Sequence, residues 1–282
     1  MDSLKVKAYA KINLSFEVLG VRQDGFHEIR TILQTIDLYD ELEFTPSSNV
    51  TFYCNVPHLN GVDNLAYRAL CLLKNAYSVD EGIGIHLRKY IPIGAGLGGG
   101  STDAAAVLIA LNEIWGLSLS GDELALMASR LGSDVPFFLT GGTAFASGRG
   151  EKIETLQPIP KTWVLVVNAR SEIGNKTSTM YQYLQHKHFT DGENVDLMVK
   201  LIASGYHIPE ALIRNTFEEI EHEVFPGNRE IRQLFKSMGV DRVHLTGSGP
   251  SLFALISEKK EGEQIISQLS LKGIEAVLVS TI

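Results

Sequence analysis

A glycine-rich segment in the first half of the chain carries the strongest chemical signal. Five glycines occupy the seven positions from Gly94 to Gly100, and Ser101-Thr102-Asp103 and an alanine-rich helical pattern follow directly. Glycine lets the backbone approach an anion closely, and the first amide groups of a helix have no acceptor within that helix. Both properties favour a phosphate-binding loop at a helix N-terminus. The alternative is a flexible turn that happens to cap a helix.

Two nucleotide-binding motifs compete for this loop. Gly94, Gly96 and Gly99 match GxGxxG, but a dinucleotide site also needs an acidic residue at the end of the next strand, about 20 positions later. The corresponding region, 117–123, predicts a helix start instead. A Walker loop needs a lysine directly after its last glycine, and none follows here. If the loop holds a triphosphate, the positive charge must come from elsewhere in the fold.

Phosphoryl transfer requires a cation near the phosphates and an aspartate that accepts the proton of the acceptor hydroxyl. Lys11 lies within the apolar strand pattern AYAKINLSF, where an unpaired charge would be costly. Its alternative is a strand-edge lysine whose stem reaches solvent. Asp134 precedes the apolar run VPFFL. Its alternative is a helix N-cap with Pro136 in the first turn, and a cap and a base are not mutually exclusive.

The periodicity of apolar residues predicts the elements that position these side chains. A helix over 64–77 begins behind a cap at Asp63 or Asn64, the helix after the glycine loop ends near Gly116, and Ser120 and Glu123 have the spacing of a capping box. Strands are predicted over residues 5–19, 31–44, 50–54 and 83–90.

The chain restarts a mixed pattern at Trp163, so we expect an α+β protein of two domains. The segment 157–161 contains two prolines and no periodicity, which favours a boundary there. We therefore predict an N-terminal domain over residues 1–158 and a C-terminal domain over 159–282.

Composition excludes several function classes. The 282 residues carry a formal net charge of −8, whereas nucleic-acid binding needs a broad basic face. The two cysteines support neither a disulfide framework nor a zinc site. No signal-peptide pattern and no run of about 18 apolar residues is seen. We expect a soluble, cytoplasmic protein, a monomer or weak homodimer, with a small-molecule substrate and neither nucleic acid nor membrane as partner.

Three separated segments resemble the signature regions of GHMP kinases: AYAKINLSFEVLGVRQDGFHE, IPIGAGLGGGSTDAAA and LTGSGPSLFAL. The first of these, together with LGSDVPFF, is similar to the diphosphocytidyl-methylerythritol kinases within that superfamily. The resemblance implies a ribosomal-S5-domain-2-like N-terminal domain and a ferredoxin-like C-terminal domain.

The same resemblance implies an activity. It is the ATP-dependent phosphorylation, with Mg²⁺, of the 2-hydroxyl of 4-diphosphocytidyl-2-C-methyl-D-erythritol in non-mevalonate isoprenoid precursor biosynthesis. One alternative is a GHMP kinase for another small alcohol, such as mevalonate, homoserine or a sugar. Another is a catalytically silent nucleotide-binding module, but such a module would be expected to lack Lys11 or Asp134.

Site residues follow from the resemblance position by position. Asp134 resembles the family's base and Lys11 the lysine that pairs with it. Phe26 and His27 resemble the residues that stack on and hydrogen-bond the cytosine ring, and Asn13 would line the same pocket. The resemblance also implies that Ser101 or Thr102 helps to hold Mg²⁺. The implied ATP loop comprises Pro92, Ile93, Gly94, Ala95, Gly96, Leu97, Gly98, Gly99, Gly100, Ser101 and Thr102.

Two further positions leave alternatives open. Gly247, Ser248 and Gly249 resemble the third motif, whose amides would face substrate or nucleotide phosphates, although a plain turn between strands has the same pattern. Tyr181 lies in a segment that only loosely resembles the family's PxxxVSTxxxY. It is either a second cytosine-stacking ring or a core or surface tyrosine.

Overall fold

The computed structural model describes residues 3–169, 174–206 and 208–282. The chain forms two compact units, each assembled from separated segments. Unit 1 comprises residues 1–10, 38–93 and 98–141, and unit 2 comprises residues 11–37, 94–97 and 142–282. Two long strands, β1 (Leu4–Val21) and β2 (His27–Pro46), each contribute one end to unit 1 and the other to unit 2.

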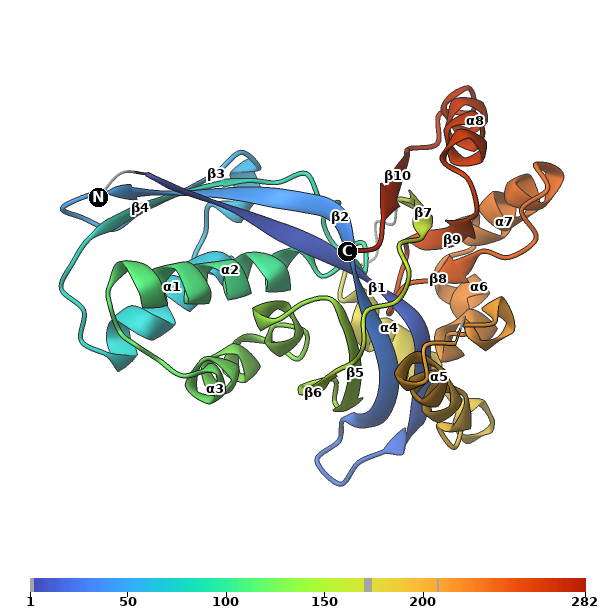
Figure 1. The fold of residues 1–282 in the computed structure, drawn as a ribbon, viewed down its shortest axis with the longest axis horizontal. Helices are drawn as coiled ribbons and strands as arrows, with labels where there is room; N and C mark the ends of the chain where they lie inside the picture. The colour runs from blue at the N-terminus through green and yellow to red at the C-terminus, as the bar shows by residue number, and fades with distance from the viewer. Residues whose placement is uncertain (1–2, 170–173, 207) are drawn as a thin grey trace. The chain divides into compact units, whose positions relative to one another are not determined.

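Unit 1 is a sheet covered on one face by helices (Figure 1). Residues 41–46 of β2 pair antiparallel with β4 (Ile83–Arg88), which pairs parallel with β3 (Thr51–Cys54). The α-helices are α1 (Leu65–Ala76), α2 (Gly99–Ile114) and α3 (Gly121–Leu131). Two short 3₁₀ helices, labelled η, accompany them: η1 (Pro57–Leu59) and η2 (Pro136–Leu139). Their apolar faces and the inner face of the sheet form one core, which includes Phe44, Leu70 and Leu108.

The helix starts in unit 1 follow the predicted chemistry. The Asn64 side chain accepts a hydrogen bond from the Ala66 amide at 2.9 Å, so Asn64 is the cap of α1. Ser120 and Glu123 form the predicted capping box at the start of α3. α2 carries alanines at its buried positions, which let the helix lie close to α1 and to the sheet.

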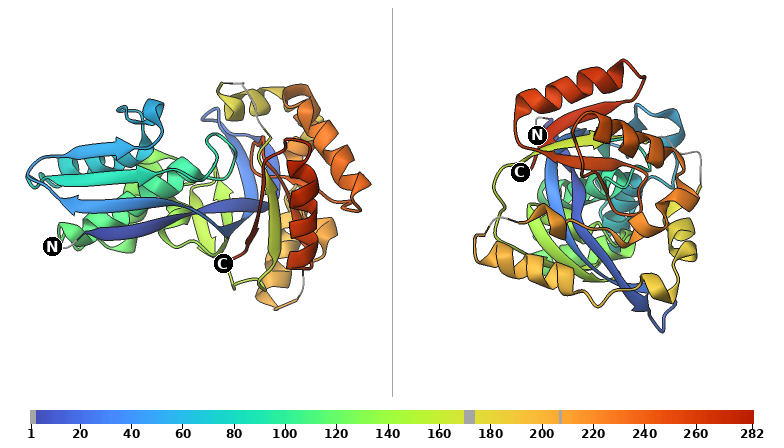
Figure 2. Two further views of the ribbon diagram at one scale, coloured as in Figure 1. Left: turned by 90° about the horizontal axis from the view of Figure 1, so that it is seen from above. Right: turned by 90° about the vertical axis from the view of Figure 1, so that its right-hand side faces the viewer.

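Unit 2 contains two sheet regions. Residues 29–34 of β2 pair antiparallel with β5 (Thr143–Gly148), which pairs with β6 (Lys152–Thr155). A second, antiparallel sheet has the order β10 (Ala276–Ser280), β7 (Trp163–Val167), β9 (Leu252–Ile256) and β8 (His244–Leu245). The long helix α8 (Lys259–Ser270) runs alongside this sheet (Figure 2).

The remaining helical elements of unit 2 lie between β7 and β8 in the chain. They are α4 (Lys176–Tyr183), η3 (His186–His188), α5 (Glu193–Ala203), η4 (Glu210–Leu212), η5 (Thr216–Glu219), α6 (Glu221–Val224) and α7 (Gly227–Ser237). The predicted α+β class is confirmed. Across the part of the chain that the structure describes, no helix combines the length and apolar character needed to cross a membrane.

Candidate active site

Lys11 and Asn13 lie on β1 in unit 2, and both are buried. Residues two apart on a strand point to the same face, and the Lys11 Nζ donates a hydrogen bond to Asn13 Oδ1 at 2.7 Å. Asn13 Nδ2 donates in turn to Thr31 Oγ1 at 2.8 Å. The Lys11 backbone amide donates to the carbonyl of Leu97 at 3.0 Å, which brings the first signature segment against the glycine loop.

The glycine turn of the third motif packs on the same two side chains. A Cβ atom added to Gly247 would lie 3.2 Å from Asn13 Oδ1 and 3.3 Å from Lys11 Nζ. The Asn13 amide also donates to Thr246 Oγ1 at 3.2 Å. The structure therefore brings together Lys11, Asn13 and Gly247, which the sequence placed in separate motifs.

Asn215, the N-cap of a short helix about thirty positions earlier in the chain, holds this turn and was missed in the sequence. Its side-chain amide donates to the carbonyls of Leu245 and Gly247 at 2.8 and 2.7 Å, while its Oδ1 accepts from the Phe217 amide at 3.0 Å. Asn215 is 5% exposed. These hydrogen bonds fix the backbone on both sides of the bend at Gly247. No motif or periodicity in the sequence pointed to this asparagine.

The first part of the glycine loop, residues 94–97, packs on the same turn. Gly96 has a φ of +79°, and a Cβ atom there would lie 2.5 Å from the Thr246 carbonyl oxygen. A side chain at this position would collide with backbone as well as strain the left-handed conformation. The Ser251 amide donates to the carbonyl of Ala95 at 3.3 Å. The close approach of two backbones explains why the loop requires glycine here.

The second part of the loop leads into α2 in unit 1. Gly98 is the N-cap of α2, with a φ of +74°. Because glycine has no side chain, it cannot form a capping hydrogen bond to the first amides of the helix. The first amides of α2, starting at Gly99, therefore belong to the set that has no helical acceptor. Together with the positive end of the helix dipole, these amides suit a phosphate group. This is the local geometry that the glycine pattern predicted.

A buried ion cluster supports the loop from inside unit 1. The Lys89 ammonium contacts Asp40 Oδ2 and donates to Asp103 Oδ2 at 2.6 Å, and all three side chains are at most 5% exposed. Asp40 Oδ1 also accepts from the Tyr90 and Ile91 amides at 2.5 and 2.8 Å, immediately before the loop. Burial raises the pKa of Asp103 to about 8. The cluster ties β2, the entrance of the loop and the first turns of α2 together.

Asp134 lies in the turn between α3 and η2 and is partly buried. The N-cap of η2 is Val135, with Pro136 in the first turn and no capping bond from a side chain. The N-cap position of this helix therefore falls one residue after Asp134. The chain reaches η2 one residue later than the sequence pattern suggested.

The residues expected at the cytosine ring lie in unit 2. The His27 ring stacks on Tyr181, with centroids 4.5 Å apart and an interplanar angle of 24°. Tyr181 in turn meets Phe217 edge-on at 5.0 Å and packs against the core of this unit. Burial lowers the pKa of His27, so the imidazole is neutral at neutral pH and can both donate and accept a hydrogen bond.

Phe26 has a different environment from its neighbour His27. Phe26 is 53% exposed, and the Arg149 guanidinium lies 4.8 Å from its ring centroid. The Phe26 amide donates to Asp24 Oδ1 at 3.1 Å, which fixes the Asp24-Gly25 turn. An exposed aromatic face beside a stacked imidazole can receive a flat heterocycle. Arg149 is a second residue that the sequence analysis missed, because it lies more than a hundred positions away.

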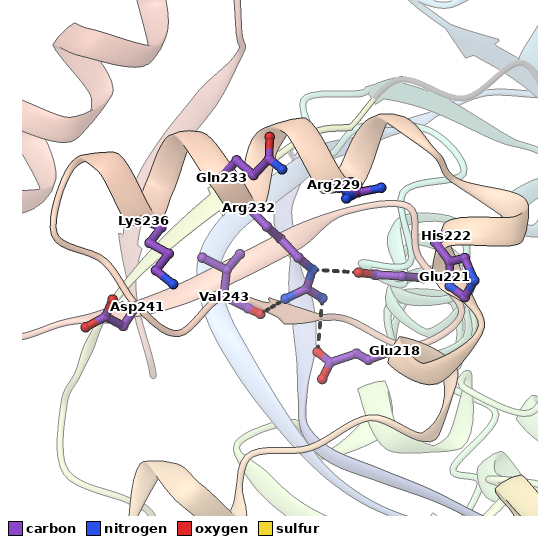
Figure 3. Close-up of a pocket in the computed structure, with 9 residues that line it drawn as sticks. All are labelled: Glu218, Glu221, His222, Arg229, Arg232, Gln233, Lys236, Asp241 and Val243. Atoms are coloured by element: carbon purple, nitrogen blue, oxygen red, sulfur yellow. Dashed lines mark hydrogen bonds and ion pairs between the residues drawn. The ribbon is translucent and has the colours of Figure 1, made fainter.

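A separate hollow of about 320 Å³ lies beside α7 in unit 2 and contains none of the predicted site residues. Figure 3 shows that the Arg232 guanidinium crosses it to reach Glu221, Glu218 and the carbonyl of Val243. Glu218 also accepts from the Leu245 amide at 2.6 Å. Burial raises the pKa of Glu218 to about 7 and lowers that of the nearby His244 to about 4. This network supports the strand that leads into the Gly247 turn.

Mg²⁺ belongs to the chemistry that the resemblance implies, and the oxygen donors present can be compared with what this ion requires. Among the described residues, no group of three or more His, Cys, Asp and Glu side chains could hold a metal. Kinases bind Mg²⁺ largely through substrate phosphates and few protein oxygens. The Ser101 hydroxyl, in the first turn of α2, is an oxygen donor of the required kind. The residues present therefore fit an ion that arrives with the nucleotide.

Comparisons with known proteins identify the family to which the chain belongs. The family model for the GHMP kinases N terminal domain matches residues 64–142, and that for the GHMP kinases C terminal matches residues 198–275. A curated 4-diphosphocytidyl-2-C-methyl-D-erythritol kinase of Bacillus cereus is 43% identical over 272 residues, covering 94% of this chain and 92% of its own. The protein of the same name from Dehalococcoides mccartyi is 39% identical over 280 residues, covering 99% and 98%.

A solved structure is similar along its whole length. The crystal structure of a 4-(cytidine 5'-diphospho)-2C-methyl-D-erythritol kinase superposes with a TM-score of 0.84 at 32% identity, covering 99% of each chain. The chain therefore belongs to the GHMP kinase superfamily and, within it, to the family of the 4-diphosphocytidyl-2-C-methyl-D-erythritol kinases.

Proposed function

We propose that this chain transfers the terminal phosphoryl group of ATP to the 2-hydroxyl of 4-diphosphocytidyl-2-C-methyl-D-erythritol, a step in non-mevalonate isoprenoid precursor synthesis. The observation that carries the proposal is the similarity, at 39% and 43% identity over nearly the whole chain, to kinases named for this substrate. The alternative acceptors (mevalonate, homoserine or a sugar) lack a cytosine ring and give no role to the stacked His27 and Tyr181.

Asp134 is the proposed base. It accepts the proton of the 2-hydroxyl as the hydroxyl oxygen bonds to the terminal phosphorus of ATP and the bond to ADP breaks. Lys11 is the proposed cation that keeps Asp134 ionised and offsets charge on the transferred group. The burial of Lys11 beside Asn13 supports this role, because a buried ammonium interacts strongly with nearby charge.

The ATP phosphates are proposed to bind residues 92–102 through backbone amides. Support comes from the glycine conformations of the loop and from the exposed amides expected at the start of α2. Mg²⁺ would neutralise charge on the phosphates, and Ser101 is the proposed protein ligand. In the turn Gly247, Ser248 and Gly249, the amides of the first two residues are proposed to bind phosphate groups of the substrate or nucleotide, because the Gly249 amide already donates to the Thr246 carbonyl at 3.0 Å.

Phe26, His27 and Asn13 are proposed to form the cytosine pocket, with Tyr181 as its second aromatic ring. The stacked geometry of His27 and Tyr181 supports an aromatic pocket at this place. We propose a boundary between residues 158 and 159, which falls between the two family models. The compact units divide the chain differently, since residues 11–37, 94–97 and 142–158 belong to unit 2. We also propose a cytoplasmic monomer or weak homodimer without nucleic-acid or membrane partners, in keeping with its two free cysteines and acidic charge.

The test is ATP turnover by the purified protein with Mg²⁺ and each of four acceptors: the cytidyl substrate, mevalonate, homoserine and galactose. We expect turnover with the cytidyl substrate alone, and a loss of at least about a thousandfold in kcat for Asp134→Asn with little change in KM. Turnover with another acceptor would overturn the substrate assignment. Full activity of the Asp134 variant would overturn the base.

A further inference from the structure

The glycine loop contains no cation of its own. Residues 92–102 include neither lysine nor arginine, although the terminal phosphates of a bound nucleotide carry several negative charges that transfer requires to be offset. Lys11 is already hydrogen-bonded to Asn13 and buried beneath the loop. A second positive charge at the loop would complete the arrangement.

Lys176, the first residue of α4, reaches this loop. Its Nζ donates to the carbonyl oxygen of Gly94 at 3.2 Å, and a Cβ atom added to Gly94 would lie 3.5 Å from the same Nζ. An ammonium has three N–H donors, so one bond to a carbonyl leaves two for a ligand. Lys176 and Gly94 both belong to unit 2.

Among residues 3–169, 174–206 and 208–282, no carboxylate forms an ion pair with the Lys176 ammonium, and partial burial lowers the pKa of this group. A partly buried cation without an opposite charge is unfavourable. An anion that binds beside Gly94 would remove this cost.

The start of α4 is held in place from the other side. Thr177 Oγ1 lies 2.8 Å from Ser248 Oγ, so the helix start also contacts the third motif. Three residues further on, Met180 is fully buried, and Tyr181 stacks on His27. The backbone of Lys176 is thus anchored between the glycine loop and the Gly247–Gly249 turn, and its side chain is aimed at the loop.

We propose that Lys176 binds a phosphate oxygen of a nucleotide ligand and supplies the positive charge that the glycine loop lacks. The ligand class is a nucleoside polyphosphate: the terminal phosphates of ATP, or the diphosphate of the cytidyl substrate. The proposal rests on the proposed function, since it names a further contact in that site.

Three variants of Lys176 separate charge from hydrogen bonding. Lys176→Met removes both, Lys176→Gln keeps a donor for the Gly94 carbonyl without charge, and Lys176→Arg keeps the charge. The matched control is Lys200→Met, which removes an exposed lysine from α5 in the same unit. Initial rates give kcat and the KM of each substrate, at low and at high salt.

We expect Lys176→Met and Lys176→Gln to raise one of the two KM values at least about tenfold, as is typical for loss of a charged hydrogen bond. Lys176→Arg should recover most of this loss and Lys200→Met should have no effect. A rise in the KM for ATP identifies the ATP phosphates, and a rise in the KM for the cytidyl substrate identifies its diphosphate. Wild-type KM values in Lys176→Gln would mean that Lys176 only donates a hydrogen bond to the Gly94 carbonyl, and would overturn the proposal. Unchanged KM values in Lys176→Met would also overturn it.

A binding measurement separates this proposal from the function itself. The rise in melting temperature caused by ADP and by CDP reports binding without turnover. Suppose that the wild-type protein fails to phosphorylate the cytidyl substrate, but that ADP raises its melting temperature more than it raises that of the Lys176→Met variant. The proposed function then fails and the lysine assignment stands. Equal stabilisation of both proteins by ADP and by CDP would contradict the lysine assignment.

Discussion

Replacing Lys89 by methionine should destabilise unit 1 by about 4 kcal/mol at neutral pH, because a buried negative charge would lose its cation. The Lys89 ammonium contacts Asp40 and Asp103, whose side chains are 0% and 2% exposed. Methionine keeps most of the volume of the lysine stem, so the loss measures the missing charge more than missing packing. Burial raises the pKa of Asp103 to about 8, so this side chain is largely protonated at pH 7. In the variant the Asp40 carboxylate is then the one that loses its cation.

The magnitude has two independent estimates. Removing one partner of a buried ion pair costs roughly 3–5 kcal/mol. The variant can also avoid a buried charge by protonating the unpaired carboxylate. For an aspartate with an unfolded-state pKa of about 3.9, this protonation costs about 4 kcal/mol at pH 7. At pH 5 the same protonation costs about 1.5 kcal/mol. The destabilisation should therefore shrink by more than half on acidification.

The assay is urea unfolding of wild type and variant at both pH values. Trp115 lies in unit 1 and Trp163 in unit 2, so a Trp163→Phe background makes fluorescence report on unit 1. Lys5→Met is the control, because Lys5 pairs with Glu43 at 3.7 Å on the surface and should cost less than about 1 kcal/mol. Adding Asp40→Asn to the Lys89 variant should restore part of the loss. A destabilisation that is equal at pH 5 and pH 7 would refute the reasoning and point to packing instead.

Three other perturbations follow from the geometry. Burial lowers the pKa of His244 from 6.5 to about 4 and raises that of Glu218 from 4.5 to about 7. The Glu218→Gln variant keeps only the histidine effect, so its free energy of unfolding should fall by up to ~3 kcal/mol as pH falls from 6.5 to 4. The His244→Gln variant keeps only the glutamate effect and should lose stability as pH rises from 4.5 to 7, and urea midpoints measure both changes. In wild type the two effects oppose each other, so a flat Glu218→Gln profile would contradict this assignment. Gly96→Ala should lower stability by at least ~2 kcal/mol more than Gly239→Ala, which has a similar positive φ but open space around it; equal losses would mean that strain alone matters. Tyr181→Leu should raise the KM for the cytidyl substrate about tenfold and leave the KM for ATP within about twofold; an unchanged cytidyl KM would return Tyr181 to a core role.

The sequence predicted what depends on neighbours in the chain. The Ser120 and Glu123 capping box, the Asn64 cap and the glycine loop at the start of α2 are local patterns, and the structure contains all three. The strands were also found, although β2 begins at His27, earlier than the predicted start at residue 31. That difference arises because the first residues of β2 pair with β5, from Ile29 onward, and such a partner far along the chain is invisible to periodicity.

The sequence could not predict the contacts between distant segments that complete the site. Lys89 was read only as part of a strand, yet it binds Asp40 and Asp103, which stand 49 and 14 positions away. The stacking of His27 on Tyr181 has the same origin, since a ring contact depends on tertiary packing and not on spacing. The N-cap of η2 is Val135, one residue after Asp134, and positions of helix ends commonly differ by one or two residues.

The order in which the chain is synthesised has a consequence for its folding. The first strand leaves the ribosome early, but its Phe16 and Val18 amides donate to Arg214 and Thr216, about 200 positions later. The Ile282 amide donates to the carbonyl of Thr35, and the Ile282 carbonyl accepts from the side chain of Gln34. Unit 2 therefore cannot complete its backbone pairing until Ile282 has been synthesised, and pairing over such separations slows folding.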